Sequence, residues 1–226
     1  MGDRFREAAA LVRSEFSTII VITMLFELPS LAVSQYMPGK SPWIMYVTFA
    51  VSLVMGLLSN AAVIWILSEH QRMREAGLLE SIEAAIMFFP RLLIANILPA
   101  IFIAAGLLCF IIPGVVLMVR YSFINCLVIL EGTRPADARE RSAAYSAPVQ
   151  REILAGMLAV LAASLIFFAV GFGLDGAAPG PKAAFSLVAA VVSALIGAWF
   201  QGYVLLYFRE RSRKMAADRG SPAGGE

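Results

Sequence analysis

Residues 92–130 form one apolar stretch in which Arg120 is the only charged side chain. As a single α-helix this stretch would be about 58 Å long, because each residue adds about 1.5 Å. The hydrocarbon core of a bilayer is only about 30 Å thick, so such a chain has to turn back on itself. We predict the turn at Pro113-Gly114, because proline lacks an amide donor and glycine adopts backbone angles that other residues avoid.

The composition places the whole chain in the class of membrane proteins. Hydrophobic residues make up 60% of the sequence and charged residues 15%, whereas soluble domains have roughly 45–50% and about 25%. Strand-like alternation is absent, and a helix satisfies its own backbone hydrogen bonds in lipid. We therefore predict an all-α integral membrane protein with six transmembrane helices arranged as three hairpins. The six apolar runs are 17–37, 43–68, 92–112, 115–130, 152–173 and 184–208.

The basic residues predict how the chain is oriented. Every lysine and arginine except Lys40, Lys182 and Arg120 falls before the first run, after the last run, or in the second or fourth connection between runs. Basic residues near the ends of membrane helices are retained on the cytoplasmic side. Both termini are therefore expected to face the cytoplasm.

Three segments on the predicted cytoplasmic side precede a helical hairpin and contain an acidic residue followed by alanine. Apolar residues at helical spacing predict a short interfacial helix in each segment. The second helix is expected to end at Pro90, and the third to have Thr133 as its N-cap and Pro135 in its first turn. The shared dipeptide indicates either a threefold repeat or a coincidence of amphipathic composition. The dipeptides are Glu7-Ala8, Glu83-Ala84 and Asp137-Ala138.

Residues 111–146, IIPGVVLMVRYSFINCLVILEGTRPADARERSAAYS, combine an Ile-Pro-Gly turn, an arginine followed by an aromatic residue, a Glu-Gly pair and a short helix with alanine and serine. This pattern resembles a group of bacterial inner-membrane proteins that includes YciC-type proteins and the membrane domains attached to some glycerophosphodiester phosphodiesterases. The resemblance implies an architecture more than an activity, since the sequence holds no soluble phosphodiesterase domain. The matching positions are Ile112, Pro113, Gly114, Arg120, Ser122, Glu131, Gly132, Ala138 and Ser142.

The sequence displays no catalytic or metal-binding constellation. His70 is the only histidine, and it has no HExxH motif or Cys/His cluster around it. A serine nucleophile would need a base within reach, and no GxSxG motif occurs. Cys109 and Cys126 both fall in apolar runs without the spacing of a disulfide scaffold or a thiolate metal site. We therefore expect no enzymatic activity, no cofactor and no metal.

Glu27 and Arg120 are charged side chains within predicted spans, where ionisable groups are expensive and usually face protein or water. Their expected depths differ by roughly 7 Å, which an arginine side chain could bridge, so an ion pair is one hypothesis. Alternatively, Arg120 extends to the outer headgroups while Glu27 is protonated or hydrogen-bonded to an amide. The amides within the spans are Asn60, Asn96, Asn125 and Gln201.

Small and polar residues recur at four-residue spacing in the second and sixth runs. Such stripes let helices approach and hydrogen-bond to each other, so we expect them to pack within the bundle, against a second copy of the chain or against another membrane subunit. Pro29, Pro99 and Pro113 are expected to kink helices, the alternative being a solute site at a broken helix. The stripes are Ser52, Gly56 and Asn60, and Ala189, Ser193, Gly197 and Gln201.

These features favour a non-enzymatic accessory or scaffold protein of the bacterial cytoplasmic (inner) membrane, linked to membrane lipid or envelope homeostasis as the resemblance implies. Basic residues in 209–214 can attract anionic lipids at the cytoplasmic face, although the orientation rule alone also explains them. The alternative function is a small transporter or permease subunit that uses Glu27 and Arg120. Expected partners are the lipid bilayer and a second copy or another membrane protein, and the net charge of +2 gives no reason to expect nucleic acid. The predicted organisation is a six-helix membrane domain, 1–215, and a flexible cytoplasmic tail, 216–226.

Overall fold

The structure, a computed structural model, describes residues 2–36, 42–74, 77–173 and 179–220. Within these ranges every regular element is helical and no strand is present, which confirms the predicted all-α class. The elements are α1 (Gly2–Ser14), α2 (Phe16–Tyr36), α3 (Pro42–His70), α4 (Leu78–Cys109), α5 (Ile111–Arg120), α6 (Ile124–Leu130), α7 (Pro135–Ser146), the 3-10 turn η1 (Ala147–Val149), α8 (Gln150–Gly173) and α9 (Pro179–Gly220).

Several of these helices are suited to a bilayer. Five helical segments of the described chain are long and apolar enough to cross a membrane. The pair formed by α1 and the first part of α2 passes the same test when taken together, with a bend of 78° between the two, and raises the possible number of spans to six. The predicted apolar runs fall on α2, α3, α4, α5 with α6, α8 and α9. The prediction of a chain with several membrane-spanning helices is therefore confirmed.

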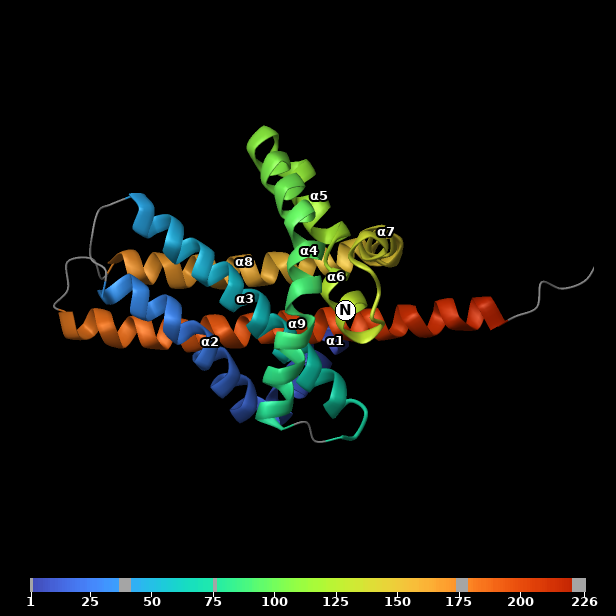
Figure 1. Ribbon diagram of the computed structural model, residues 1–226, viewed down its shortest axis with the longest axis horizontal. Coiled ribbons are helices and arrows are strands. Elements are labelled where there is room, and N and C mark those ends of the chain that lie inside the picture. Colours follow the sequence, from blue (N-terminus) through green and yellow to red (C-terminus); the bar gives the residue numbers. More distant parts are fainter. Residues whose placement is uncertain (1, 37–41, 75–76, 174–178, 221–226) are drawn as a thin grey trace, which may run out of the picture.

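The longest helix, α9, is the element to which much of the structure is attached. Figure 1 shows α8 and α9 along the long axis of the molecule, whereas α4 and α5 project away from them. Consecutive long helices contact each other, α2 with α3, α4 with α5 and α8 with α9. In addition, α9 contacts α1, α2 and α3.

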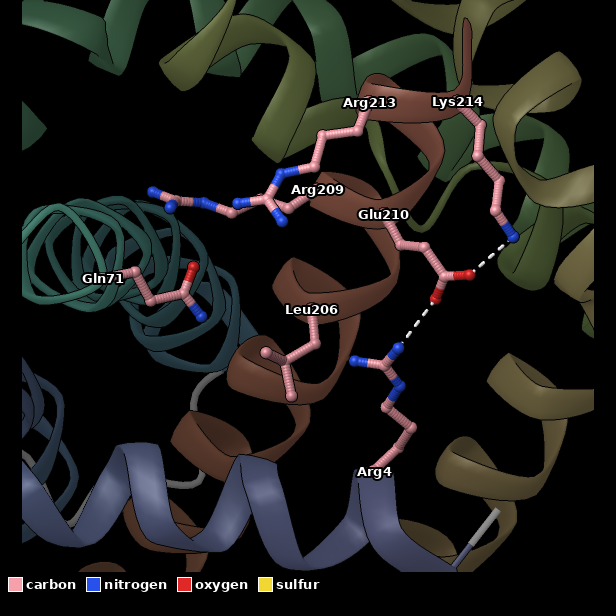
Figure 2. A pocket seen from close by; sticks show the side chains of 7 residues that line it. All are labelled: Arg4, Gln71, Leu206, Arg209, Glu210, Arg213 and Lys214. Carbon is pink, nitrogen blue, oxygen red and sulfur yellow. Dashed lines mark hydrogen bonds and ion pairs between the residues drawn. The ribbon is translucent and has the colours of Figure 1, made fainter. Parts of the chain in front are cut away.

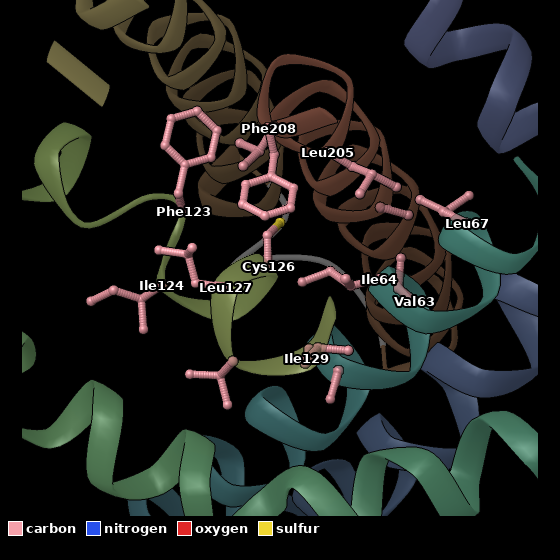
Figure 3. Packing of buried hydrophobic residues seen from close by; sticks show 14 of the residues in the cluster. Val63, Ile64, Leu67, Phe123, Ile124, Cys126, Leu127, Ile129, Leu205 and Phe208 are labelled. Atoms are coloured by element: carbon pink, nitrogen blue, oxygen red, sulfur yellow. The ribbon is translucent and has the colours of Figure 1, made fainter. Parts of the chain in front are cut away.

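The buried core is centred on α6, a helix of only 7 residues. Ile124, Cys126 and Leu127 are shielded almost completely and pack with side chains of α3 and α9 (Figure 3). Because lipid tails are as apolar as these side chains, close packing rather than exclusion of water holds helices together inside a bilayer. The partners shown are Val63, Ile64 and Leu67 from α3 and Leu205 and Phe208 from α9.

The first helix, α1, is amphipathic and docks on α9 with its apolar face. Ala8 and Val12 are buried, while the Phe5 ring lies 5.1 Å from the ring of Trp199 and 5.0 Å from that of Tyr203, between ring centroids. The Trp199 indole also donates to the Phe5 carbonyl (3.3 Å). The helix predicted for this segment is therefore present, and the 78° bend turns it away from the direction of α2.

The second predicted interfacial helix does not end where we expected. α4 continues through Pro90 and Pro99 to a length of 32 residues, and α2 likewise continues through Pro29. A proline removes one hydrogen bond and typically costs about 3 kcal/mol inside a soluble helix. Membrane helices tolerate prolines because neighbouring groups satisfy the freed backbone. The prediction of a stop at Pro90 is wrong, since the amphipathic segment and the apolar run form one helix.

The turn between α4 and α5 lies at Phe110, three residues before the predicted Pro113-Gly114. The extended backbone of Phe110 (φ −156°, ψ 131°) separates the two helices. Pro113 is then the third residue of α5, where it fits because the first amides of a helix have no partner within the helix. Gly114 allows close approach instead: a Cβ there would lie 2.5 Å from Cγ of Leu107.

The third predicted interfacial helix is α7. Arg134, rather than the predicted Thr133, is its N-cap, and no side-chain hydrogen bond caps it. The Thr133 amide donates instead to the carbonyl of Leu127 (3.2 Å), which closes the end of α6. Gly132 has a φ of 62°, a conformation that favours glycine just past a helix end.

The last helix is longer than the apolar run that predicted it. α9 comprises 42 residues and ends at Gly220, so residues 216–220 of the predicted flexible tail are helical. Alanine has the highest helix propensity of all residues. Ala216 and Ala217 therefore favour continuation of the helix beyond its apolar part. The rest of the predicted tail lies outside the described residues.

Gly114→Ala is expected to destabilise the protein, because the new Cβ would lie 2.7 Å from the backbone nitrogen of Leu107. Overpacking of this kind costs about 1–3 kcal/mol of unfolding free energy. Thermal unfolding of the purified protein in detergent measures the loss. Gly56→Ala is the matched control in α3, because nothing lies within 4 Å of a Cβ built there. Equal losses in both variants would contradict the close approach of α4 and α5.

Candidate functional site

Two serines of α7 close the break between α5 and α6. The chain leaves α5 at Arg120 and becomes helical again at Ile124, so the backbone between them needs partners from elsewhere. The Ser142 hydroxyl donates to the Arg120 carbonyl (2.8 Å) and accepts from the Phe123 amide (3.2 Å), and the Ser146 hydroxyl donates to the same carbonyl (3.4 Å). An unsatisfied backbone group in lipid costs several kcal/mol. The serines therefore make a broken segment tolerable within a candidate membrane span.

Glu131, another position of the sequence pattern, directly follows α6 and links it to two other helices. Glu131 accepts hydrogen bonds from the hydroxyls of Tyr145 (3.1 Å) and Ser212 (3.2 Å) and pairs with Arg141 (3.3 Å). Tyr145 and Arg141 belong to α7 and Ser212 to α9, so one carboxylate links both helices to the end of α6. These contacts indicate a structural role for the pattern positions Glu131 and Ser142, the positive φ of Gly132 suits its place after α6, and Ala138 is fully buried.

Ser142→Ala is expected to lower the unfolding free energy by about 1–3 kcal/mol, because the buried Phe123 amide loses its acceptor. Near-ultraviolet circular dichroism during thermal unfolding reports the loss. Ser146→Ala is the control, since its hydroxyl lies 3.4 Å from the Arg120 carbonyl and also donates to Ala143 (3.1 Å). A loss for Ser146→Ala as large as that for Ser142→Ala would contradict the assignment of the closure to Ser142.

The four amides predicted as intramembrane polar residues pair with each other. Asn96 of α4 donates to Asn125 of α6 (2.9 Å), and Gln201 of α9 donates to Asn60 of α3 (3.2 Å). Hydrogen bonds between membrane helices contribute about 0.6 kcal/mol on average. The amides therefore act as cross-links between helices that are distant in the sequence.

Asn96 and Asn125 are expected to be energetically coupled. Each alanine variant removes the same hydrogen bond, so the double variant should lose about 0.6 kcal/mol less than the sum of the single variants. Unfolding in mixed detergent micelles measures the four free energies of the cycle. The cycle for Asn96 with Gln201, which share no hydrogen bond, should be additive. Additivity for Asn96 with Asn125 would exclude the bond as a source of stability.

Glu27 and Arg120 belong to different helices, α2 and α5. Glu27 of α2 lines a cavity between α2, α3 and α9, whereas Arg120 is exposed at the end of α5. Arg120 takes part in no ion pair between described residues. The hypothesis of a Glu27–Arg120 pair thus finds no contact in the described chain, and the exposure of Arg120 agrees with the alternative in which its side chain extends outward.

A second cavity, of about 460 Å³, lies between α3, α4, α5, α8 and α9. Its walls are apolar except for Asn96, Tyr121 and Ser122. Cavities of this size, apolar with a few polar groups, are typical of sites for small organic ligands. This apolar cavity offers a surface on which an acyl chain or a partner side chain can pack.

A third cavity, of about 460 Å³, lies where α1, the end of α3 and the last turns of α9 meet (Figure 2). Glu210 is shared there by two cations, with Arg4 Nη2 at 3.0 Å and Lys214 Nζ at 2.6 Å from its two oxygens. Arg4 also pairs with Glu7 (2.9 Å). The residues lining this basic cavity are Arg4, Gln71, Leu206, Arg209, Glu210, Arg213 and Lys214.

The other side of the basic cavity carries positive charge that Glu210 does not reach. The Arg209 guanidinium donates to the Ser68 carbonyl (2.7 Å) and lies near the cationic side chains of Arg72 and Arg213 and the carboxylate of Glu69, which pairs with Arg72 (2.9 Å). Arg213 is exposed and forms no ion pair with any described residue. The buried Oε1 of Gln71 has no hydrogen-bond partner among the described residues. Like charges held together in this way favour the binding of an anion.

The charge run 209–214 predicted part of the basic cavity. Two further residues that line the cavity were not identified from the sequence. Arg4 lies far from the run in the sequence and reaches it only because α1 docks on α9. Gln71 follows α3 and carries no charge that would mark it. Nδ1 of His70, the only histidine of the sequence, lies 2.8 Å from the carboxylate of Glu15. No group of His, Cys, Asp and Glu side chains in the described ranges is arranged to hold a metal ion.

No protein-family model, curated protein or solved structure matches this chain. Its function therefore has to be inferred from the chemistry of its own residues.

Proposed function

We propose that the protein is a non-enzymatic accessory or scaffold protein of the bacterial inner membrane that binds anionic lipids at its cytoplasmic face. In this proposal six spanning helices form three hairpins, with both termini in the cytoplasm. The proposal keeps the likeness to YciC-type proteins as a hypothesis about ancestry. Support for the membrane placement comes from the apolar spans and from the segregation of basic residues to one side of the predicted topology.

The observation that carries the proposal is the basic cavity. Four basic side chains and one carboxylate line it, so its charge exceeds what the carboxylate neutralises. It lies between the end of a candidate membrane span and the amphipathic helix α1, which is bent by 78° from α2. This is the level at which lipid phosphates would lie if α1 rests in the membrane interface.

The charge pattern exceeds what orientation alone requires. The orientation rule needs basic residues near the inner ends of helices, but it does not require them to converge from α1 and α9 on one cavity. Arginine forks match phosphate oxygens well, and a basic side chain near an anionic membrane surface contributes about 1 kcal/mol. A phospholipid with a net negative headgroup fits this arrangement better than a zwitterionic one.

A second candidate function, a small transporter or permease subunit, is favoured by the cavity that Glu27 lines between α2, α3 and α9. A scaffold role toward a second copy or another membrane protein is favoured by the apolar cavity between α3, α4, α5, α8 and α9.

Arg213→Gln is expected to weaken binding of phosphatidylglycerol about fivefold, which corresponds to loss of about 1 kcal/mol from one basic residue. Native mass spectrometry of the detergent-purified protein with added lipid measures the bound fraction. Arg213 is the best choice because its side chain is exposed and forms no ion pair with a described residue, so the fold should survive.

Arg134→Gln is the matched control, because it removes the same charge from an exposed position outside the cavity, at the start of α7. Binding to this variant should equal binding to the unchanged protein. Phosphatidylcholine should bind less tightly to all three. Equal weakening in both variants, or equal affinity for the two lipids, would argue against a lipid site in the basic cavity.

A further inference from the structure

The apolar cavity between α3, α4, α5, α8 and α9 follows one face of α4. Leu93, Asn96, Ile97 and Ala100 line it at intervals of three and four residues, which is the spacing of one helix face. From Asn96 the lining continues along α4 to Ile103, a distance of about 10 Å at the rise of an α-helix. The cavity is therefore long enough to hold part of an extended chain beside α4.

The polar groups of the apolar cavity gather where α5 ends. Tyr121 and Ser122 line the cavity and lie in the break between α5 and α6. Asn96 reaches the same place, because its amide nitrogen donates to Asn125 in the first turn of α6 (2.9 Å). From there toward the turn between α4 and α5, the residues of these two helices that line the cavity are apolar. The cavity thus has a polar end at the break and an apolar end toward the turn.

The polar end can both accept a hydrogen bond from a ligand and donate one to it. The Asn96 amide nitrogen bonds to two oxygens of the protein, and its Oδ1 takes part in neither bond. The Ser122 hydroxyl donates to the Val119 carbonyl (2.9 Å), which leaves its oxygen as an acceptor. Tyr121 adds a phenolic hydroxyl, which donates and accepts. A ligand hydroxyl, itself both donor and acceptor, matches this set of groups.

The size and position of the apolar cavity suit a lipid-like molecule. Its volume of about 460 Å³ lies within the range of sites for small organic ligands. Met118 of α5 and Met157 of α8 contribute unbranched side chains, which adapt to the shape of a ligand. All five surrounding helices belong to segments that are long and apolar enough to cross a membrane, so a ligand can enter from the bilayer.

The lining also indicates the charge of the ligand. No lysine, arginine, aspartate or glutamate is among the described residues that line the cavity, and the exposed Arg120 is not one of them. A charged headgroup buried there would lack an opposite charge, and the tail of a phospholipid would bring no hydroxyl to the polar end. We propose that this cavity binds an uncharged single-chain lipid with a hydroxyl head, a long-chain alcohol or monoacylglycerol, whose hydroxyl lies at Asn96 and Tyr121.

This site goes beyond the lipid-binding function proposed above, and either proposal can fail without the other. The apolar cavity and the basic cavity share no lining residue. The basic cavity takes an anionic headgroup, whereas the apolar cavity takes an uncharged ligand by its chain and its hydroxyl.

The test uses an analogue of 1-hexadecanol with a photoreactive diazirine in its chain, added to the full chain in phosphatidylcholine nanodiscs. Irradiation attaches the probe to the side chains around it, and peptide mass spectrometry locates the attachment. We expect attachment within residues 97–103 and at Met118 or Met157. Unlabelled 1-hexadecanol should compete for these positions. Hexadecane at the same mole fraction should compete about fivefold less well, because it forms no hydrogen bond. Hexadecanesulfonate, which keeps its charge, should compete less well than 1-hexadecanol.

A first pair of variants locates the chain. Ala100→Trp places a large ring in the cavity and should abolish attachment at Met118 and Met157. Ala105→Trp is the matched control, because Ala105 is an exposed alanine of the same helix that does not line the cavity. This control should be labelled like the unchanged protein.

A second pair of variants tests recognition of the hydroxyl. Tyr121→Phe keeps the ring and should weaken competition by 1-hexadecanol about fivefold, while competition by hexadecane stays the same. Tyr46→Phe removes a hydroxyl from an exposed tyrosine of α3 outside the cavity and should change neither.

The proposal is overturned if 1-hexadecanol does not compete, if hexadecane or hexadecanesulfonate competes as well as 1-hexadecanol, or if Ala100→Trp is labelled like Ala105→Trp. A second copy of the chain seated on the cavity would keep the probe out, and the absence of attachment would also overturn it. Should Ala100→Trp fail to fold, Tyr121→Phe and Tyr46→Phe still decide, because a purely structural effect would change competition by both compounds alike.

Discussion

Inside a bilayer every backbone amide and carbonyl needs a partner from the protein, and this constraint is most demanding at the break between α5 and α6. The chain stops being helical after Arg120, and Ser142 satisfies both a carbonyl and an amide in the gap. With the gap closed, α6 can enter the middle of the core and pack on α3 and α9. The same contacts fix α7, whose Tyr145 reaches Glu131. The placement of α7 against the α5–α6 break thus depends in part on one buried serine.

The spans could be predicted from the sequence because run length and hydropathy follow directly from the thickness and polarity of the bilayer. The residues at which helices end could not be predicted in this way. Pro90 lies inside α4, and the turn lies at Phe110 rather than at Pro113-Gly114. In these cases the packing of neighbouring helices and the lipid surroundings override the local preference of proline. Residues 216–220 show the reverse error, since α9 continues through them although the apolar run had ended before them.

The candidate sites were predictable only as types of residue. Amides inside apolar runs stood out as polar, but their pairing as Asn96 with Asn125 and Asn60 with Gln201 needed the fold. The sequence does not distinguish the glycines, yet Gly114 allows a close helix contact, whereas Gly56 of α3 and Gly197 of α9 line a cavity. The space around a residue, which separates these two roles, is a property of tertiary packing and leaves no mark on local composition.

The basic cavity depends both on a charge run that is visible in the sequence and on the tertiary packing of α1 against α9. Hydropathy and charge placed a cationic run at the end of α9, and docking of α1 brought Arg4 to it across almost the whole chain. Apolar contacts of Phe5 with Trp199 and Tyr203 produce this docking, so a packing interaction determines where a charge lies. Glu210 neutralises the positive charge of this cavity only in part. A lipid phosphate, the ligand that we propose for the cavity, would neutralise the remaining charge.

The most direct measurement is a cryo-electron microscopy structure of the protein in nanodiscs that contain phosphatidylglycerol. We predict density for a lipid phosphate in contact with Arg213 and Arg209, with α1 lying along the membrane surface. A basic cavity filled only by solvent, or one placed away from the headgroup layer, would contradict the proposed lipid-binding function.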